Sequence, residues 1–225
     1  MTDLTLSGDI IKILLVLVLS TAAFIITQRS LSSLFGLYTL QSFLMAVIAV
    51  VLFSRDGALS LLFIAILTMA SKVIFIPVFL RRLLLRMPIK RDLEYRYLTA
   101  VGSIILSTAL LILVYWVFSA LAIGLRFDTL TLMGAVIGVT LTLSGMMVIA
   151  SRKQVITKVI GYLTMENGVL IFSLFVAEMP FIIEVLIIVD LLMIIVLSAL
   201  LAFGIDSSIE AFHKRLAQFG LDFED

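Results

Sequence analysis

Long apolar stretches follow one another along almost the whole sequence, and they limit what the chain can fold into more than any other feature. Each stretch reaches the length of about 20 predominantly apolar residues that a transmembrane helix needs. None shows the alternation of apolar and polar residues that is typical of a half-buried strand. We therefore expect an all-α integral membrane protein of about seven transmembrane helices. The expected spans are residues 9–27, 31–53, 58–80, 99–123, 129–150, 158–177 and 181–204.

The composition supports a membrane protein and leaves little room for a soluble domain. Hydrophobic residues make up 63% of the 225 residues, whereas ordinary globular chains contain about 45–50%. Charged residues make up 14%, against about 25% in such chains. A water-soluble domain this apolar has too little polar surface to cover itself, but lipid acts as a solvent for helices of this kind.

The basic residues are distributed unevenly over the two ends of the expected helices. Most of them fall in segments that face one side: Arg29, Arg81, Arg82, Arg86, Lys90, Arg91, Arg96, Arg152, Lys153, Lys158, Lys214 and Arg215. The opposite side holds only Lys12, Arg55 and Arg126. By the positive-inside rule, we expect the N-terminus outside and the C-terminus in the cytoplasm.

Three regions follow from these spans. Residues 1–128 hold four helices and a basic cytoplasmic loop at 81–98, residues 129–205 hold a bundle of three helices, and residues 206–225 form a cytoplasmic tail. The loop is either an ordinary positive anchor at the lipid surface or a contact for a soluble partner. Apolar residues recur at helical spacing in the tail, which predicts an amphipathic helix that rests on lipid or docks against another subunit.

Residues that bind metals and haem are almost absent. The chain has no cysteine and one histidine, His213. Cysteine-ligated iron–sulfur clusters, thiolate-bound haem and haem held by two histidines are therefore excluded within this chain. The net charge of +1 gives no basic footprint for nucleic acid. We expect a chain without catalytic residues, which binds no metal, no cofactor and no nucleic acid.

Four charged residues lie inside the expected helices: Lys72, Glu166, Glu184 and Asp190. A charge at the bilayer centre costs about 2.5–3.5 kcal/mol, so each of these residues needs a reason. Carboxyl groups and a lysine at this depth suit proton transfer or coupling, and we expect that role for all four. The alternatives are a lysine that snorkels to the interface and carboxyl groups that form static hydrogen bonds between helices.

Depth and spacing separate the three carboxyl groups. Glu166 and Asp190 lie in the middle of their spans, whereas Glu184 lies about 5 Å inside the outer boundary. Glu184 and Asp190 share one expected helix but fall on different faces of it, so we expect them to meet different neighbours. Either of them can be the relay group of the last helix.

Proline and glycine predict local geometry near these groups. Pro77 follows Lys72 by five residues, and a proline there frees a backbone carbonyl one turn back and kinks the helix. Gly134 and Gly138 form a GxxxG pattern, which predicts close helix packing rather than a binding site.

Two of these segments resemble a known family. The run Met165-Glu-Asn-Gly168 and the pattern Pro180-x-x-x-Glu184-x5-Asp190 closely resemble the E component of hydrogenase-4-type formate hydrogenlyase, and Lys72 to Pro77 looks like the third span of that family. The last three helices resemble the K subunit of respiratory complex I and the C subunit of multi-subunit Na+/H+ antiporters. In these two subunits, membrane glutamates on the second and third of the three helices belong to a central hydrophilic proton axis, and Glu166 lies on the corresponding second helix.

The resemblance implies a membrane-arm subunit of a group 4 membrane-bound NiFe hydrogenase or a related complex, in the prokaryotic cytoplasmic (inner) membrane. Its partners would be antiporter-like large membrane subunits, a membrane subunit like the H subunit of complex I, and peripheral cytoplasmic hydrogenase subunits. Those partners would carry the iron–sulfur clusters and a NiFe centre or a formate- or CO-oxidising centre. The alternatives are a structural or assembly subunit without ion transfer, and an autonomous seven-helix transporter or receptor.

Overall fold

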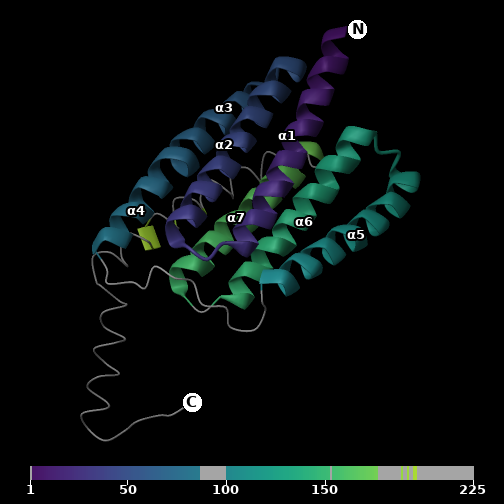
Figure 1. The fold of residues 1–225 in the computed structure, drawn as a ribbon. Coiled ribbons are helices and arrows are strands. Elements are labelled where there is room, and N and C mark those ends of the chain that lie inside the picture. The colour runs from purple at the N-terminus through teal and green to yellow at the C-terminus, as the bar shows by residue number, and fades with distance from the viewer. Residues whose placement is uncertain are drawn as a thin grey trace, which may run out of the picture.

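A computed structural model describes residues 2–86, 100–152 and 154–176, together with the single positions Val189, Leu192, Ile195 and Val196. Over these residues the protein is a bundle of helices without a β-strand (Figure 1). The elements are α1 (Thr2–Thr27), α2 (Leu31–Asp56), α3 (Leu59–Thr68), the π-helical turn η1 (Met69–Phe75), α4 (Ile76–Arg86), α5 (Ala100–Leu125), α6 (Thr129–Ser151) and α7 (Val155–Phe175).

The described residues contain 6 helices that are long and apolar enough to cross a membrane. They coincide with the first six expected spans, and α3, η1 and α4 together form the third of them, Leu59–Arg82. The all-α membrane character is thereby confirmed. The seventh expected span, 181–204, lies outside the described residues apart from the four single positions, which are helical.

The structure corrects the end of the third span. We expected the helix to stop at residue 80 and a loop to begin at 81, but α4 continues to Arg86. Hydropathy marks where the apolar residues end, whereas a helix ends where its backbone is interrupted, and Pro88 is the first residue that disfavours a helix before it. Arg81, Arg82 and Arg86 therefore belong to α4. Residues 87–98 of the expected loop and the tail 206–225 lie outside the described residues.

Short turns with polar caps join the neighbouring helices. Ser30 caps α2, where its side chain accepts a hydrogen bond from the backbone N–H of Ser33. Gly57 ends α2 in the left-handed region at φ 69°, a conformation that glycine adopts without strain. Asp128 caps α6 and accepts a hydrogen bond from the N–H of Thr131 at 3.1 Å. These caps satisfy helix-end groups that lipid cannot hydrate.

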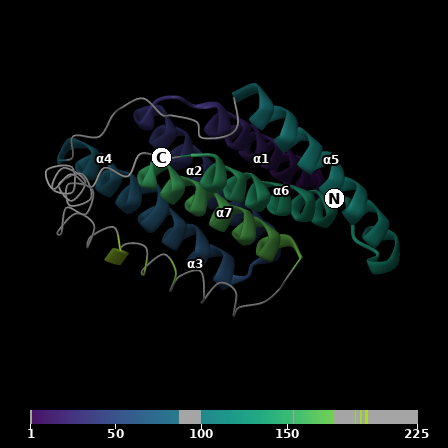
Figure 2. The same cartoon turned by 90° about the horizontal axis from the view of Figure 1, so that it is seen from below.

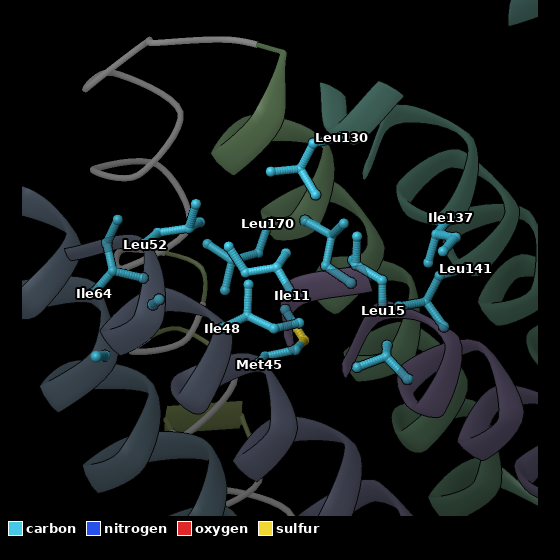
Figure 3. Close-up of a cluster of buried hydrophobic side chains, with 14 of the residues drawn as sticks. Ile11, Leu15, Met45, Ile48, Leu52, Ile64, Leu130, Ile137, Leu141 and Leu170 are labelled. Carbon is cyan, nitrogen blue, oxygen red and sulfur yellow. The ribbon is translucent and has the colours of Figure 1, made fainter. Parts of the chain in front are cut away.

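The helices α1, α2, α6 and α7 form the middle of the bundle, with α3–α4 at one edge and α5 at the other (Figures 1 and 2). One cluster of buried side chains joins α1, α2, α3, α6 and α7, and Figure 3 shows most of it. A second cluster, around Tyr38 and Ile160, joins α1, α2, α6 and α7 to α4 nearer the other end. Both clusters contain residues from either side of position 128, so the helices of 1–128 and 129–176 share one core.

Glycines bring α6 and α7 into backbone contact. Gly138 lies against Gly168, and Gly145 lies against Gly161. A Cβ atom at Gly138 would lie 2.7 Å from the backbone nitrogen of Phe172, and one at Gly145 would lie 2.6 Å from the carbonyl oxygen of Gly161. No side chain fits at such distances, so these glycines fix the register in which α7 runs antiparallel to α6.

A buried arginine connects the α6–α7 turn to the α1–α2 turn by hydrogen bonds. Arg152, which is 2% exposed, donates hydrogen bonds of 2.8 Å from Nη2 to the carbonyl oxygens of Ile26 and Gln28. These carbonyls belong to the C-terminal end of α1, where a cation also compensates the helix dipole. The α1–α2 and α6–α7 turns therefore lie at the same end of the bundle, which we call the Arg152 end.

Candidate functional site

Lys72 and Glu166 form an ion pair in the interior of the bundle. The Nζ atom of Lys72 lies 2.8 Å from Oε1 of Glu166, and both side chains are 2% exposed. Lys72 belongs to η1 and Glu166 to α7, so the pair joins segments 94 residues apart in the sequence. A charge this deeply buried is tolerated only with a partner at hydrogen-bonding distance. The lysine does not snorkel, because its side chain is buried against the carboxylate.

The ion pair lies near the middle of the membrane-spanning segments. Lys72 stands roughly halfway along the span Leu59–Arg82, and Glu166 stands halfway along Ile156–Phe175. Each residue is about 15 Å or more from the Arg152 end of its helix, at 1.5 Å per residue. That depth matches the centre of a hydrocarbon core about 30 Å thick.

The backbone around Lys72 is π-helical. Met69–Phe75 form the turn η1, at the end of which the N–H of Ile76 donates to the carbonyl oxygen of Ser71, five residues back. The following residue is Pro77, which has no N–H to continue the α-helical ladder. The sequence predicted a disturbance at this point, and the structure places a wider turn there, which carries the side chain of Lys72. Turns of this type are frequent at functional sites.

Asn167 connects the ion pair to a chain of polar side chains. Its Oδ1 atom accepts a hydrogen bond from Nζ of Lys72 at 3.3 Å. Its Nδ2 atom donates to Oε1 of Gln41 at 3.1 Å and to Oγ of Ser42 at 3.3 Å. Gln41 then donates from Nε2 to Oγ1 of Thr21 at 3.2 Å. All five side chains are buried.

The first and last side chains of this hydrogen-bonded series, Lys72 and Thr21, fix the direction of every hydrogen bond in it. A lysine ammonium can only donate, so Asn167 must turn its oxygen towards Lys72 and its NH2 group towards Gln41. At the far end, the hydroxyl of Thr21 donates at 2.6 Å to the carbonyl oxygen of Val18, which can only accept. Gln41 must therefore present its NH2 group to Thr21. Asn167 thus turns an oxygen, and not an NH2 group, towards the ammonium of Lys72.

Among these hydrogen-bonded side chains, only Lys72 and Glu166 can gain or lose a proton. The other members, Asn167, Gln41 and Thr21, are amides and a hydroxyl that stay neutral at ordinary pH. A proton can pass from Nζ of Lys72 to Oε1 of Glu166, which converts the ion pair into a neutral amine and a neutral carboxylic acid. The arrangement thus provides one protonatable pair at mid-depth, held in place by neutral groups.

The remaining candidate residues fall in different places. Gly134 lies against the side chain of Phe175, so together with Gly138 it packs on α7 and is remote from the ion pair. Glu184 and Asp190 lie outside the described residues. Among the residues that the structure describes, no three His, Cys, Asp or Glu side chains gather as a metal site would require.

The neutral polar partners of the ion pair cannot be found by looking for charged residues in the expected helices. Gln41, Ser42 and Thr21 lie within expected spans, and an amide in such a stretch is a weaker signal than a charge. Asn167 stands within the Met-Glu-Asn-Gly motif, where a neutral amide is a weaker signal than the charge of Glu166 beside it.

Comparison of the chain with protein-family models, with curated proteins and with solved structures finds no match. The resemblance to the hydrogenase-4 family therefore stays a prediction that rests on the quoted motifs.

Proposed function

We propose that this chain is a non-catalytic membrane-arm subunit of a redox-driven ion-translocating complex, of the group 4 hydrogenase or formate hydrogenlyase type. The observation that carries the proposal is the Lys72–Glu166 pair, because it places two protonatable groups at mid-depth with 2% exposure. A chain that needed only stability would gain little from such a pair, since desolvation offsets much of its attraction.

In this proposal the pair takes part in proton transfer by changing its protonation state. A proton that reaches Glu166 removes its negative charge and leaves the ammonium of Lys72 without a counter-charge, which favours release of a proton from Lys72. A charge that arrives in a neighbouring subunit shifts the same equilibrium through the low-dielectric interior. Lys72 and Glu166 thus couple an electrostatic change outside the chain to proton movement within it.

The wider assignment rests on the sequence motifs. It places the chain in the prokaryotic inner membrane, beside antiporter-like subunits, a subunit like the H subunit of complex I, and peripheral hydrogenase subunits that hold the redox centres. Glu184 and Asp190 would continue the transfer path on the last helix. The coupled ion is H+ or Na+.

A structural or assembly role is the second candidate. The observation that favours it is the amide chain, because Asn167, Gln41 and Thr21 hold the pair in one geometry. A double substitution separates the two functions. K72M/E166L replaces both charges by apolar groups of similar volume, which is often tolerated for buried ion pairs.

Under the proposed function, K72M/E166L assembles and loses ion transfer, whereas a static pair would leave ion transfer intact. E166Q alone should also lose ion transfer. D56N is the control, since the side chain of Asp56 is 51% exposed at the end of α2. Ion transfer is measured in membrane vesicles, and assembly is measured as the yield of complex on a native gel. Normal ion transfer by the assembled double variant would contradict the proposal.

The membership of a complex has its own test. A tagged chain is solubilised gently, run on a native gel, and the co-migrating chains are identified by mass spectrometry. Antiporter-like and NiFe or iron–sulfur subunits in the band are the expected result. A stable band that contains only this chain would overturn the subunit assignment.

A further inference from the structure

Many hydroxyl groups in the described helices are satisfied by their own helix. They donate to a backbone carbonyl three or four residues back, which is the usual solution for a hydroxyl in a membrane helix. The residues that do so include Ser20, Thr39, Ser71, Thr142, Thr157, Thr164 and Ser173. Two buried hydroxyls differ from them. Ser103 and Thr140, which are 1% and 0% exposed, have no hydrogen-bond partner in the part of the chain that the structure describes.

These two hydroxyls belong to one line of polar groups between α5 and α6. Ser103 and Ser107 stand one turn apart on α5, and Thr140 and Ser144 stand one turn apart on α6. The two helices meet where Oγ of Ser107 and Oγ of Ser144 lie 3.3 Å apart. Residues separated by four positions share a helix face, so Ser103 and Thr140 continue this line on either side of the meeting point. We call Ser103, Ser107, Ser144 and Thr140 the hydroxyl seam.

The hydroxyl seam runs from the Arg152 end of the bundle to mid-depth. Ser107 and Ser144 each stand seven residues from the end of their helices, at Ala100 and Ser151. At 1.5 Å per residue, Ser103 lies about 5 Å from that end and Thr140 about 16 Å from it. The glycine register of α6 and α7 makes Thr140 level with Glu166.

The spacing along the hydroxyl seam fits single water molecules. Hydroxyls four residues apart on one helix are separated by about 6 Å along the axis, which is too far for a direct O–H···O hydrogen bond of about 2.8 Å. One water molecule between them completes two such bonds. Buried waters are found at sites like this, where polar groups lack protein partners.

We propose that the hydroxyl seam binds a file of water molecules that enters at the Arg152 end and reaches the depth of the ion pair. One water lies between Ser103 and Ser107, and a further water lies between Ser144 and Thr140. The hydrogen bond between Ser107 and Ser144 opens transiently to join the two. The file goes beyond the proposed function, because hydration of the seam does not depend on whether Lys72 and Glu166 transfer protons. If they do, the file brings protons to their depth.

Silver ions test the file, because Ag+ is small, is excluded from lipid and binds thiols. The natural chain has no cysteine, so single variants of the full chain carry one thiol each. S103C, S144C and T140C place it in the seam. T164C is the matched control, since Thr164 is equally buried on α7 at a similar depth and its hydroxyl is bonded to Ile160. T108C on the exposed face of α5 reports entry from lipid.

The rate at which Ag+ blocks later thiol labelling should be at least about tenfold higher in the three seam variants than in T164C and T108C, because a cation needs water to reach that depth. Equal rates in T140C and T164C would overturn the proposal. A second variant tests the direction of entry. Adding S107L should slow the blocking of T140C and leave S103C unchanged, and unchanged blocking of T140C would contradict a file that enters at the Arg152 end.

Discussion

At the scale of single residues, Asn167 decides how the charge of Lys72 is held. Asn167 bonds both to Lys72 and to Gln41, so it connects the lysine to the amide of Gln41. Replacing Asn167 by leucine removes the Nδ2 donor, so the buried Oε1 atom of Gln41 loses that hydrogen bond. We expect N167L to lower the free energy of unfolding by about 1–3 kcal/mol, which is the cost of buried polar groups that lose their partner.

A double-mutant cycle checks that these residues act as one unit. Once N167L has broken the chain, adding Q41L should cost less than Q41L costs alone, with a coupling of about 0.5–3 kcal/mol. S42A serves as the milder comparison, because Ser42 bonds to Asn167 but does not continue the chain to Thr21. Unfolding is measured by heating the protein in detergent. Strictly additive costs would show that the amides do not cooperate.

The sequence predicts the charged residues of the site but not their partners. Lys72 and Glu166 stand out because charges in an apolar stretch are costly. Their pairing was not predictable, since 94 residues separate them and it is the packing of both η1 and α7 on α2 that brings them together. Arg152 shows the opposite case. It read as one member of a basic loop, yet it is buried because its guanidinium reaches carbonyls at the end of α1.

At the scale of the elements, the contact between α6 and α7 depends on the absence of side chains. G145A would place a methyl group 2.6 Å from the carbonyl oxygen of Gly161, and neither backbone can move without shifting the helix that carries Glu166. We expect G145A to destabilise the protein by about 1–3 kcal/mol, as overpacking does in other cores. G36A is the control, because nothing lies within 4 Å of a Cβ there. It should be neutral or stabilising by up to about 1 kcal/mol. Equal melting temperatures for the two variants would contradict the backbone contact.

The cap of α6 predicts a dependence of stability on pH. A hydrogen bond from the side chain of Thr131, followed by the backbone N–H of Thr131 and the charge of Arg55, lowers the pKa of Asp128 below 3.8 despite partial burial. A lowered carboxyl pKa stabilises the fold above the pKa of the unfolded chain, and this contribution is lost as the pH falls through the folded value.

D128N keeps a side chain that can cap the helix but does not titrate. We therefore expect D128A to lose about 1 kcal/mol at neutral pH, and its difference from the natural protein should shrink in acid below the ordinary carboxyl pKa. D128N should lose less. Melting temperatures between neutral pH and pH of about 3 give the comparison. A difference for D128A that stays constant over this range would show that the carboxylate charge does not contribute.

The elements themselves were predictable where hydropathy alone decides, which holds for the six helices that coincide with expected spans. The residues at which the helices end were less predictable. The helix α4 runs on to Arg86 because arginine is a good helix former and nothing before Pro88 interrupts the backbone. The π-helical turn η1 was predictable only as a disturbance near Pro77.

At the scale of the whole molecule, a single measurement of sidedness orients every described helix. Arg152 binds the end of α1, so the turns that contain Arg29 and Arg152 share one end of the bundle. The turn after α2 lies at the other end, since α2 crosses the bundle once (Figure 1). Because the basic residues gather at the Arg152 end, we expect that end in the cytoplasm.

Thiol labelling in intact cells checks this orientation in a chain that has no natural cysteine. A58C and R29C place one exposed thiol at each end of the bundle. A maleimide that cannot cross the membrane should label A58C in intact cells and R29C only after permeabilisation. The reverse pattern would place the Arg152 end outside. The hydroxyl seam would then open to the outside, and the proposed water file would bring protons to the depth of the ion pair from that side.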